Sequence, residues 1–284
     1  MPNFVHTIPL NNRNLRIKCR ELDFITYKNL TKTIYNDSAE DIDTYVDEVL
    51  HDLIVNDDPA HFDIIDKFII LGHLRDINIS GEFQLQTECE VTKKQYAINV
   101  NLEEVLETLN KIKLKKEYTA TSGNTTINFQ LPKSFNYTSL VDTYGASIQS
   151  VGRTGEENIV IPNYVDKTEL LDKLPVSLMN DFKRFLDQQT NILNEVVLFK
   201  YKSPHSPDSV FNEYRFSFYD TASLDLLKLL FQEDLYQLYE FEYDLYHICN
   251  LPYDVVKNST FSELQLLYNI EAKRQSDSET KEQQ

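Results

Sequence analysis

The stretch Pro59–Leu74, PAHFDIIDKFIILGHL, decides the fold class because its apolar residues recur with the period of an α-helix. The side chains on one side of such a helix are Phe62, Ile65, Phe68 and Ile69. We therefore expect a helix from about Pro59 to Leu74 that directs these side chains into a core and ends near Gly72.

The segment before this helix predicts one hairpin and two further helices. FVHTIPL and LRIKC flank the polar NNRN, which predicts a two-stranded hairpin. The alternation of apolar and basic residues in LRIKCR is typical of a strand with one solvent-exposed face. Helical spacing follows from Asp23 to about Tyr35 and again from Ser38 to Ile54, where Ser38 is placed to cap the helix. The second of these helices is clearly amphipathic.

After the central helix the period changes to two, which predicts strands. NISGEFQLQTECEV and QYAINVNL form a strand pair, LEEVLETLNKI is a helix that begins after Asn101, and KKEYTATSGNTTINFQL is a hairpin that turns at Ser122–Asn124. Further on, PVSLMNDFKRFLDQQTNIL is a helix, EVVLFKYKS pairs with VFNEYRFSFYD, and helices dominate from Thr221 to about Ile270. The fold class is α+β: the N-terminal half has hairpins and amphipathic helices, and the C-terminal half is mostly helical with one strand pair.

Glycine placement suggests how the chain divides. Three of its six glycines lie in YGASIQSVGRTGEE, which favours a flexible link there. The predicted parts are an N-terminal α+β domain (1–144), a Gly-containing link (145–160), a mainly helical region (161–271) and a disordered tail (272–284).

Charge and composition exclude several classes of function. A net charge of −17 repels phosphate backbones, so we expect no nucleic-acid partner. No segment reaches the ~20 apolar residues of a membrane span. Residues 36–66 contain eleven Asp or Glu and no Lys or Arg, and two interpretations stay open: solvent-facing sides of helices, or an acidic face that docks on a basic partner.

Motifs for catalysis, cofactors and metals are missing. There is no GxGxxG, GxxxxGK or GxSxG, and the three cysteines lie far apart without a CxxC pair, which fits a reducing cytoplasm. Asp244 and His247 have the i,i+3 spacing of half a helical di-metal site, but no second pair completes it. Cys19 is interpreted as a core residue. We expect no catalytic residues, no cofactor and no metal.

The stretch Glu233–Asp254, EDLYQLYEFEYDLYHICNLPYD, is the best candidate for a functional surface. At roughly 100° per residue its tyrosines share one helical arc, beside a second apolar arc, so such a helix must be covered on two sides. The candidate partner-binding residues are Tyr236, Tyr239, Tyr243 and Tyr246. The alternative is that they belong to the core. Glu242 projects between the two arcs, so either it is paired or the helix is irregular.

The order of segments resembles a known family. LRIKCRELDFITYKNLTK, DIDTYVDEVLHDLI, FDIIDKFIILGHLRDINISGEFQL and TECEVTKKQYAINVNLEEVLETL together resemble baseplate hub and hub-assembly proteins of T-even-type contractile-tailed bacteriophages, over roughly residues 5–135. LYEFEYDLYHICNLPYDVVKNSTFSELQLLYNI is similar to the helix-turn-helix endings of tail-assembly proteins, and Thr260 with Glu263 predicts a capping box there. Val91 stands where some relatives carry a second cysteine near Cys89, which removes the case for a shared metal.

The resemblance implies a non-enzymatic late protein that acts in assembly of the tail baseplate hub, as a structural subunit or as a chaperone-like assembly factor. Its implied partners are other baseplate hub or tail proteins, with the tape-measure protein as one candidate. Its implied location is the host cell cytoplasm during assembly, with the virion tail baseplate as the alternative. The competing hypothesis is an enzyme or small-ligand-binding protein that uses the cleft between the two halves.

Overall fold

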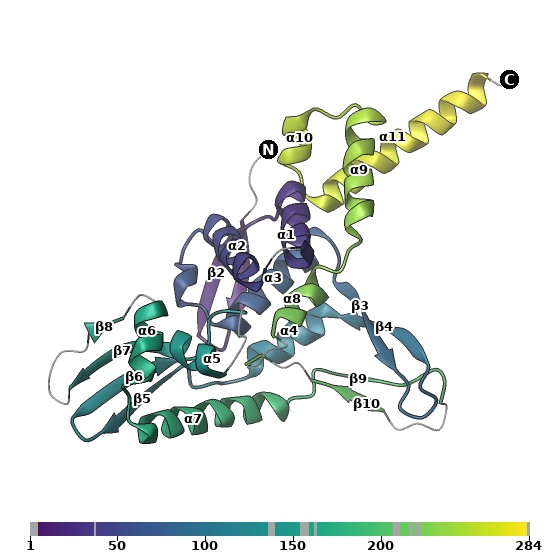
Figure 1. Cartoon of the computed structure of the whole chain (residues 1–284). Helices are drawn as coiled ribbons and strands as arrows, with labels where there is room; N and C mark the ends of the chain where they lie inside the picture. The colour runs from purple at the N-terminus through teal and green to yellow at the C-terminus, as the bar shows by residue number, and fades with distance from the viewer. Residues whose placement is uncertain are drawn as a thin grey trace.

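The computed structural model describes residues 5–36, 38–135, 140–153, 159–161, 164–206, 211–215, 218–219 and 223–282. Hairpins alternate with helices in the first half of the chain, and helices dominate the second half (Figure 1). The elements up to residue 153 are β1 (Val5–Leu10), β2 (Leu15–Arg20), α1 (Phe24–Asn36), α2 (Ala39–Leu53), η1 (Pro59–His61), α3 (Ile64–Asn78), β3 (Glu82–Glu88), β4 (Gln95–Asn101), α4 (Leu102–Lys111), β5 (Glu117–Ser122), β6 (Thr125–Gln130), α5 (Leu140–Ser147) and β7 (Ile148–Arg153). The later elements are β8 (Ile159–Val160), α6 (Tyr164–Leu171), α7 (Val176–Asn194), β9 (Phe199–Tyr201), β10 (Asn212–Tyr214), α8 (Ser223–Leu230), α9 (Leu235–His247), α10 (Tyr253–Lys257) and α11 (Phe261–Glu282). The predicted α+β class is confirmed.

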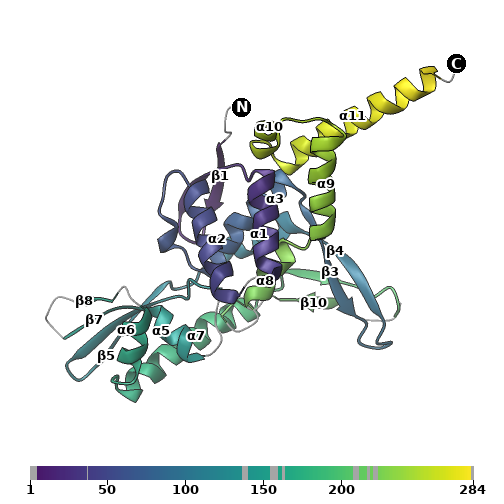
Figure 2. The same cartoon turned by 45° about the horizontal axis from the view of Figure 1, so that its top comes forward.

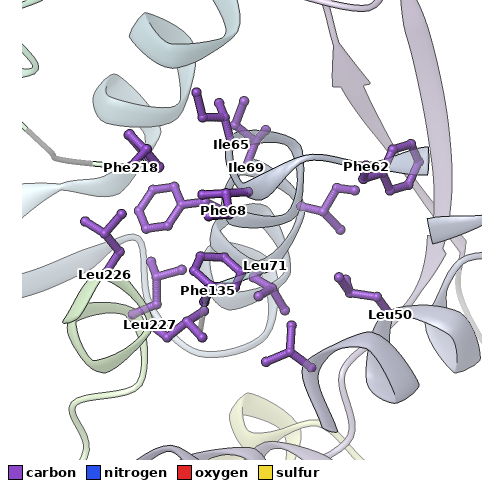
Figure 3. Close-up of a cluster of buried hydrophobic side chains, with 14 of the residues drawn as sticks. Leu50, Phe62, Ile65, Phe68, Ile69, Leu71, Phe135, Phe218, Leu226 and Leu227 are labelled. Atoms are coloured by element: carbon purple, nitrogen blue, oxygen red, sulfur yellow. The ribbon is translucent and has the colours of Figure 1, made fainter. Parts of the chain in front are cut away.

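Helix α3 is the centre of the core. It contacts β1, α4 and α8, and Figure 3 shows its side chains surrounded by apolar residues from segments far apart in the sequence. Phe68 meets Phe218 edge-to-face, with the ring centroids 5.5 Å apart. Because α3 is covered on most sides, its buried residues occur all around the helix, and they include the polar side chains of Asp66, Lys67 and Arg75.

The predicted bounds of this helix were wrong at both ends. A short 3₁₀ turn precedes α3, which begins after the capping residue Asp63 and continues past Gly72 to Asn78. Gly72 lies inside the helix because α4 approaches it closely: a Cβ there would lie 2.7 Å from Cδ2 of Leu106. The glycine therefore marks a helix–helix contact and not a helix end.

The predicted hairpins β1–β2 and β5–β6 and the predicted strand pairs β3–β4 and β9–β10 are confirmed, and all four are antiparallel. Gly123 has φ of 59° at the turn between β5 and β6, a conformation that favours glycine. Helix α7 packs on β5, and Phe129 stacks on Phe182 with the centroids 4.2 Å apart. The observed strands β9 and β10 are shorter than the predicted ones.

The predicted link and tail contain regular structure. Within residues 145–160, β7 pairs with β6 and β8 pairs with β7, so these strands complete a four-stranded sheet begun by β5 and β6. Residues 154–158 of the link lie outside the described residues. Helix α11 continues through the stretch predicted to be disordered and ends at Glu282. The division into domains stays a prediction.

Helices α9, α10 and α11 form an extension at one end of the molecule (Figures 1 and 2). In both views α11, in yellow, points away from the rest of the chain toward the C-terminus. Helix α9 contacts both α1 and α11, and Phe241 meets aromatic rings of both helices.

Candidate functional site

One face of α9 is held inward. Asp234 caps the helix, accepting a hydrogen bond of 2.8 Å from the backbone N–H of Tyr236. Leu238 and Leu245 are buried, and Phe241 packs edge-to-face against Phe24, with centroids 5.7 Å apart. The helix predicted from the tyrosine-rich stretch is present, and Leu238 and Leu245 of its second apolar arc belong to the core.

The four candidate tyrosines do not share one environment. Tyr236, Tyr239 and Tyr243 are 74%, 43% and 60% exposed. Tyr246 is half-buried and stacks on Tyr253 of α10, with the centroids 6.5 Å apart. The structure therefore brings three of the four tyrosines onto an outward surface and turns Tyr246 toward α10.

Glu242 is paired, which settles the question that its position raised. Its carboxylate accepts a hydrogen bond from the ammonium of Lys28 on α1, a side chain that is only 9% exposed. The same ammonium lies 4.8 Å from the centroid of the Tyr239 ring. Lys28 thus contacts both a carboxylate and an aromatic ring of α9, which fixes the helix on α1.

A second buried contact fixes the start of α9. The Arg75 guanidinium on α3 donates to the carboxylate of Glu233 at 2.6 Å and to the carbonyl oxygen of Leu230 at 2.6 Å. The hydroxyl of Tyr27 also donates to Glu233. Burial and the nearby Glu233 carboxylate raise the pKa of Tyr27, so the phenol stays protonated and remains a donor.

Sequence reasoning missed this Arg75–Glu233 contact. The available signal was a charged residue near the end of an apolar helix, since a buried arginine requires an acceptor. The identity of that acceptor was out of reach, because Glu233 lies far along the chain, in the connection between α8 and α9.

The acidic residues of α2 form the outer side of that helix and part of a cleft. The cleft has a volume of about 280 Å³ and lies between α2, the start of α1 and the loop from α10 to α11. Its charged lining residues are Arg20, Glu21, Asp23, Glu48, Asp52 and Lys257. Asp23 already serves as a cap, accepting from the backbone N–H and the hydroxyl of Thr26 at 2.8 Å each. Both interpretations of the acidic region therefore stay open.

A cluster of four charges joins the first hairpin to α3 and β5. Arg13 and Lys116 both contact the carboxylates of Asp63 and Asp66, which are almost fully buried. Burial acts to raise the pKa of Asp63, but Lys116 and Arg13 hold it below its ordinary value. Burial and the adjacent Asp63 raise the pKa of Asp66. Each carboxylate is engaged by cations of the chain itself, so the cluster is a structural contact.

The remaining candidate ligands and nucleophiles lie apart. Among the described residues, no group of three or more His, Cys, Asp or Glu side chains is placed to hold a metal ion. Asp244 accepts a hydrogen bond from Tyr268 at 3.5 Å, while the His247 ring lies 4.2 Å from the Tyr243 ring. Cys19 is fully buried, and burial raises the pKa of its thiol to about 12. In the described part of the chain, no helix is long and apolar enough to cross a membrane.

Comparison with known proteins gives one match. A family model described as T4 bacteriophage base plate protein matches residues 1–198, from β1 through α7. No curated protein and no solved structure matches. The match ends before β9, so the extension formed by α9, α10 and α11 lies outside it.

Proposed function

Because the chain belongs to the family of T4 bacteriophage base plate proteins, we propose that it acts in assembly of the baseplate hub, without catalysis, by binding other baseplate or tail proteins. A baseplate role follows from the family. We propose in addition that it acts in the hub and that it works by binding, without catalysis.

The observation that carries the proposal is the outward face of α9. Tyr236, Tyr239 and Tyr243 are large side chains that remain exposed on a helix whose other face is firmly packed. Tyrosine combines a large apolar ring with a polar hydroxyl, and it is enriched in the cores of protein interfaces. A rigid helix that presents several such rings is suited to bind a protein partner with little loss of conformational entropy.

Two versions of this role differ in what happens after assembly. As a structural subunit, the chain would remain in the virion tail baseplate with the α9 face covered by its neighbour. As a chaperone-like factor, it would shield an apolar segment of a partner in the host cytoplasm and then leave. Mass spectrometry of purified virions separates the two, because only the subunit is found in finished particles.

The proposal is tested by replacing Tyr236 and Tyr243 with serine in the phage that encodes the chain. These two side chains are the most exposed of the set, so we expect unchanged thermal unfolding of the purified protein together with loss of complete tails in electron micrographs. Tyr35→Ser is the matched control, because Tyr35 is 49% exposed on α1. Normal tails with the double variant would show that the α9 face is not used.

The acidic cleft supports the competing hypothesis of a small-ligand protein or enzyme. Its volume of about 280 Å³ suits a small molecule, and its carboxylates favour a cationic one. Replacing Glu48 with Gln and Asp52 with Asn removes two of these charges. Under the assembly proposal, tails form normally with this variant, and a hub or tape-measure protein still co-purifies from infected cells. Loss of phage growth with intact co-purification would favour the ligand hypothesis.

A further inference from the structure

Helix α11 exposes an apolar stripe that ends in a cation. Leu266 and Ile270 are 62% and 43% exposed, and the Arg274 side chain is 74% exposed. At about 100° per residue, these three positions lie within roughly 80° of one another on the helix surface. We call Leu266, Ile270 and Arg274 the α11 stripe.

Helix α9 exposes a stripe of complementary chemistry. Tyr236, Glu240 and Tyr243 are all exposed and lie within roughly 60° of one another on the helix surface. Glu240 sits between the two rings, one helical turn from each. We call these three residues the α9 stripe.

The two stripes of one copy do not meet each other. Within one chain α9 and α11 touch through other side chains: Phe241 lies 5.6 Å from Tyr268 between ring centroids, and Asp244 accepts a hydrogen bond from the Tyr268 hydroxyl. Leu264, on the inward side of α11, is fully buried. Each helix therefore uses one face for the internal contact and leaves its stripe open to another molecule.

We propose that the α11 stripe of one copy docks on the α9 stripe of a second copy of this chain. Arg274 would pair with Glu240, and Ile270 would then meet a tyrosine ring, because each lies one turn from the charged residue of its own helix. Within the described part of one copy, Arg274 pairs with Glu271 of its own helix at 3.5 Å, and an exposed ion pair of this kind can be replaced by another at little cost in free energy. The inference rests on the proposed function, since it names the occupant of the α9 face.

The chain already shows that this chemistry binds a cation. Lys28 contacts Glu242 and lies over the ring of Tyr239, so a carboxylate and a tyrosine ring on α9 together hold one ammonium. Glu240 with its flanking tyrosines repeats that combination on the outward side. An arginine suits this position well, because its flat guanidinium pairs with a carboxylate and also stacks on aromatic rings.

The contact joins two different surfaces, so it is heterologous and either closes into a ring or continues as a chain of copies. Two short helix faces bury less than the roughly 1,600 Å² of a standard interface, so association should depend on protein concentration.

The test is analytical ultracentrifugation of the full chain over a wide range of concentration. We expect reversible association that weakens about 10-fold or more in Glu240→Arg and in Arg274→Glu, because each places like charges together. The variant that carries both changes should recover association, since the pair is restored in reverse. Arg184→Glu is the matched control: Arg184 is 75% exposed and pairs with Asp181 three residues away on its own helix.

The outcomes separate this inference from the proposed function. Two results would show that a second copy does not occupy the α9 stripe. One is a monomer at every concentration, and the other is an association constant that neither charge reversal changes. If the Tyr236 and Tyr243 variant still fails to build tails in that case, the α9 face binds a different baseplate protein and the proposed function stands. If the chain associates as expected but that variant builds normal tails, the contact stands and the proposed function fails.

Discussion

Lys28 and Glu242, which are 214 residues apart in the sequence, form an ion pair that holds α9 against α1. The pair is mostly shielded from water, with the two side chains 9% and 18% exposed. It explains how an acidic residue is tolerated beside the apolar side of α9, and it leaves Tyr236 and Tyr243, which lie farther around the helix, exposed.

Replacing Glu242 with Gln should destabilise the protein by about 1–3 kcal/mol, because the ammonium of Lys28 loses its counterion in a largely buried position. Chemical denaturation gives the free energy of unfolding. Combining Lys28→Met with Glu242→Gln should recover part of the loss. Lys228→Met breaks an exposed pair with Asp225, so its effect should stay near zero. If Glu242→Gln and Lys228→Met lower the free energy of unfolding equally, shielding from water adds nothing to the strength of the Lys28–Glu242 pair.

Replacing Gly72 with Ala should destabilise the fold by about 1–2 kcal/mol, although alanine is the better helix former. The added methyl group would lie 2.7 Å from Cδ2 of Leu106, so α3 and α4 must shift or Leu106 must change its rotamer. Thermal unfolding measures the loss. Leu106→Val removes the clashing atom, so a double-mutant cycle should show favourable coupling; additive effects would contradict the close contact.

Replacing Asp63 with Asn should cost about 3 kcal/mol at neutral pH, because Lys116 and Arg13 lose a counterion in a buried site. Asparagine still caps α3, so the change isolates the charge. The pKa of Asp63 is held below its ordinary value in the folded state, so its carboxylate stabilises the fold above about pH 3.9 and the contribution is lost as pH falls through the folded pKa.

The measurement for Asp63 is the free energy of unfolding of both proteins against pH. The difference between wild type and Asp63→Asn should be largest near neutrality and should shrink on acidification. A difference that stays constant down to low pH would mean that the carboxylate charge is not what stabilises the site.

Cys19 should resist alkylation in the folded protein. Burial raises the pKa of its thiol to about 12, so at pH 8 only a fraction on the order of 10⁻⁴ is thiolate, the reactive form. Mass spectrometry after brief iodoacetamide treatment, with and without denaturant, checks this. Cys249 is partly exposed and provides the internal comparison. Rapid native labelling of Cys19 would contradict its position in the core.

Periodicity predicted helices and strands well where one face of the element is buried and the other is exposed. The amphipathic spacing after Ser38 predicted α2 and its cap, and the alternation in LRIKCR predicted β2, in which Ile17 and Cys19 are buried. Leu15 shows the limit of this pattern, because it is 39% exposed beside the turn of the hairpin. Alternation shows which side chains share a face of a strand, but not which part of that face is covered by other elements.

Glycine was the least reliable signal, because its meaning depends on what approaches it. Gly123 occurs at the turn that the sequence predicted, where its φ is positive, whereas Gly72 lies in mid-helix beside Leu106. The glycines of the predicted link include Gly152, which pairs with Thr126 in the four-stranded sheet. A residue without a side chain permits a turn, a close contact or a strand, and local sequence does not choose among them.

The sequence alone determined the α+β class, most of the hairpins and helices, and the resemblance to phage baseplate proteins, because each depends on local periodicity or on the order of segments along the chain. The tertiary structure decided which tyrosines of α9 face outward, that Glu242 meets Lys28, and that Arg75 holds Glu233. These are contacts between residues distant in the sequence, and whether a polar side chain is paired or an aromatic one covered depends on which elements pack beside it.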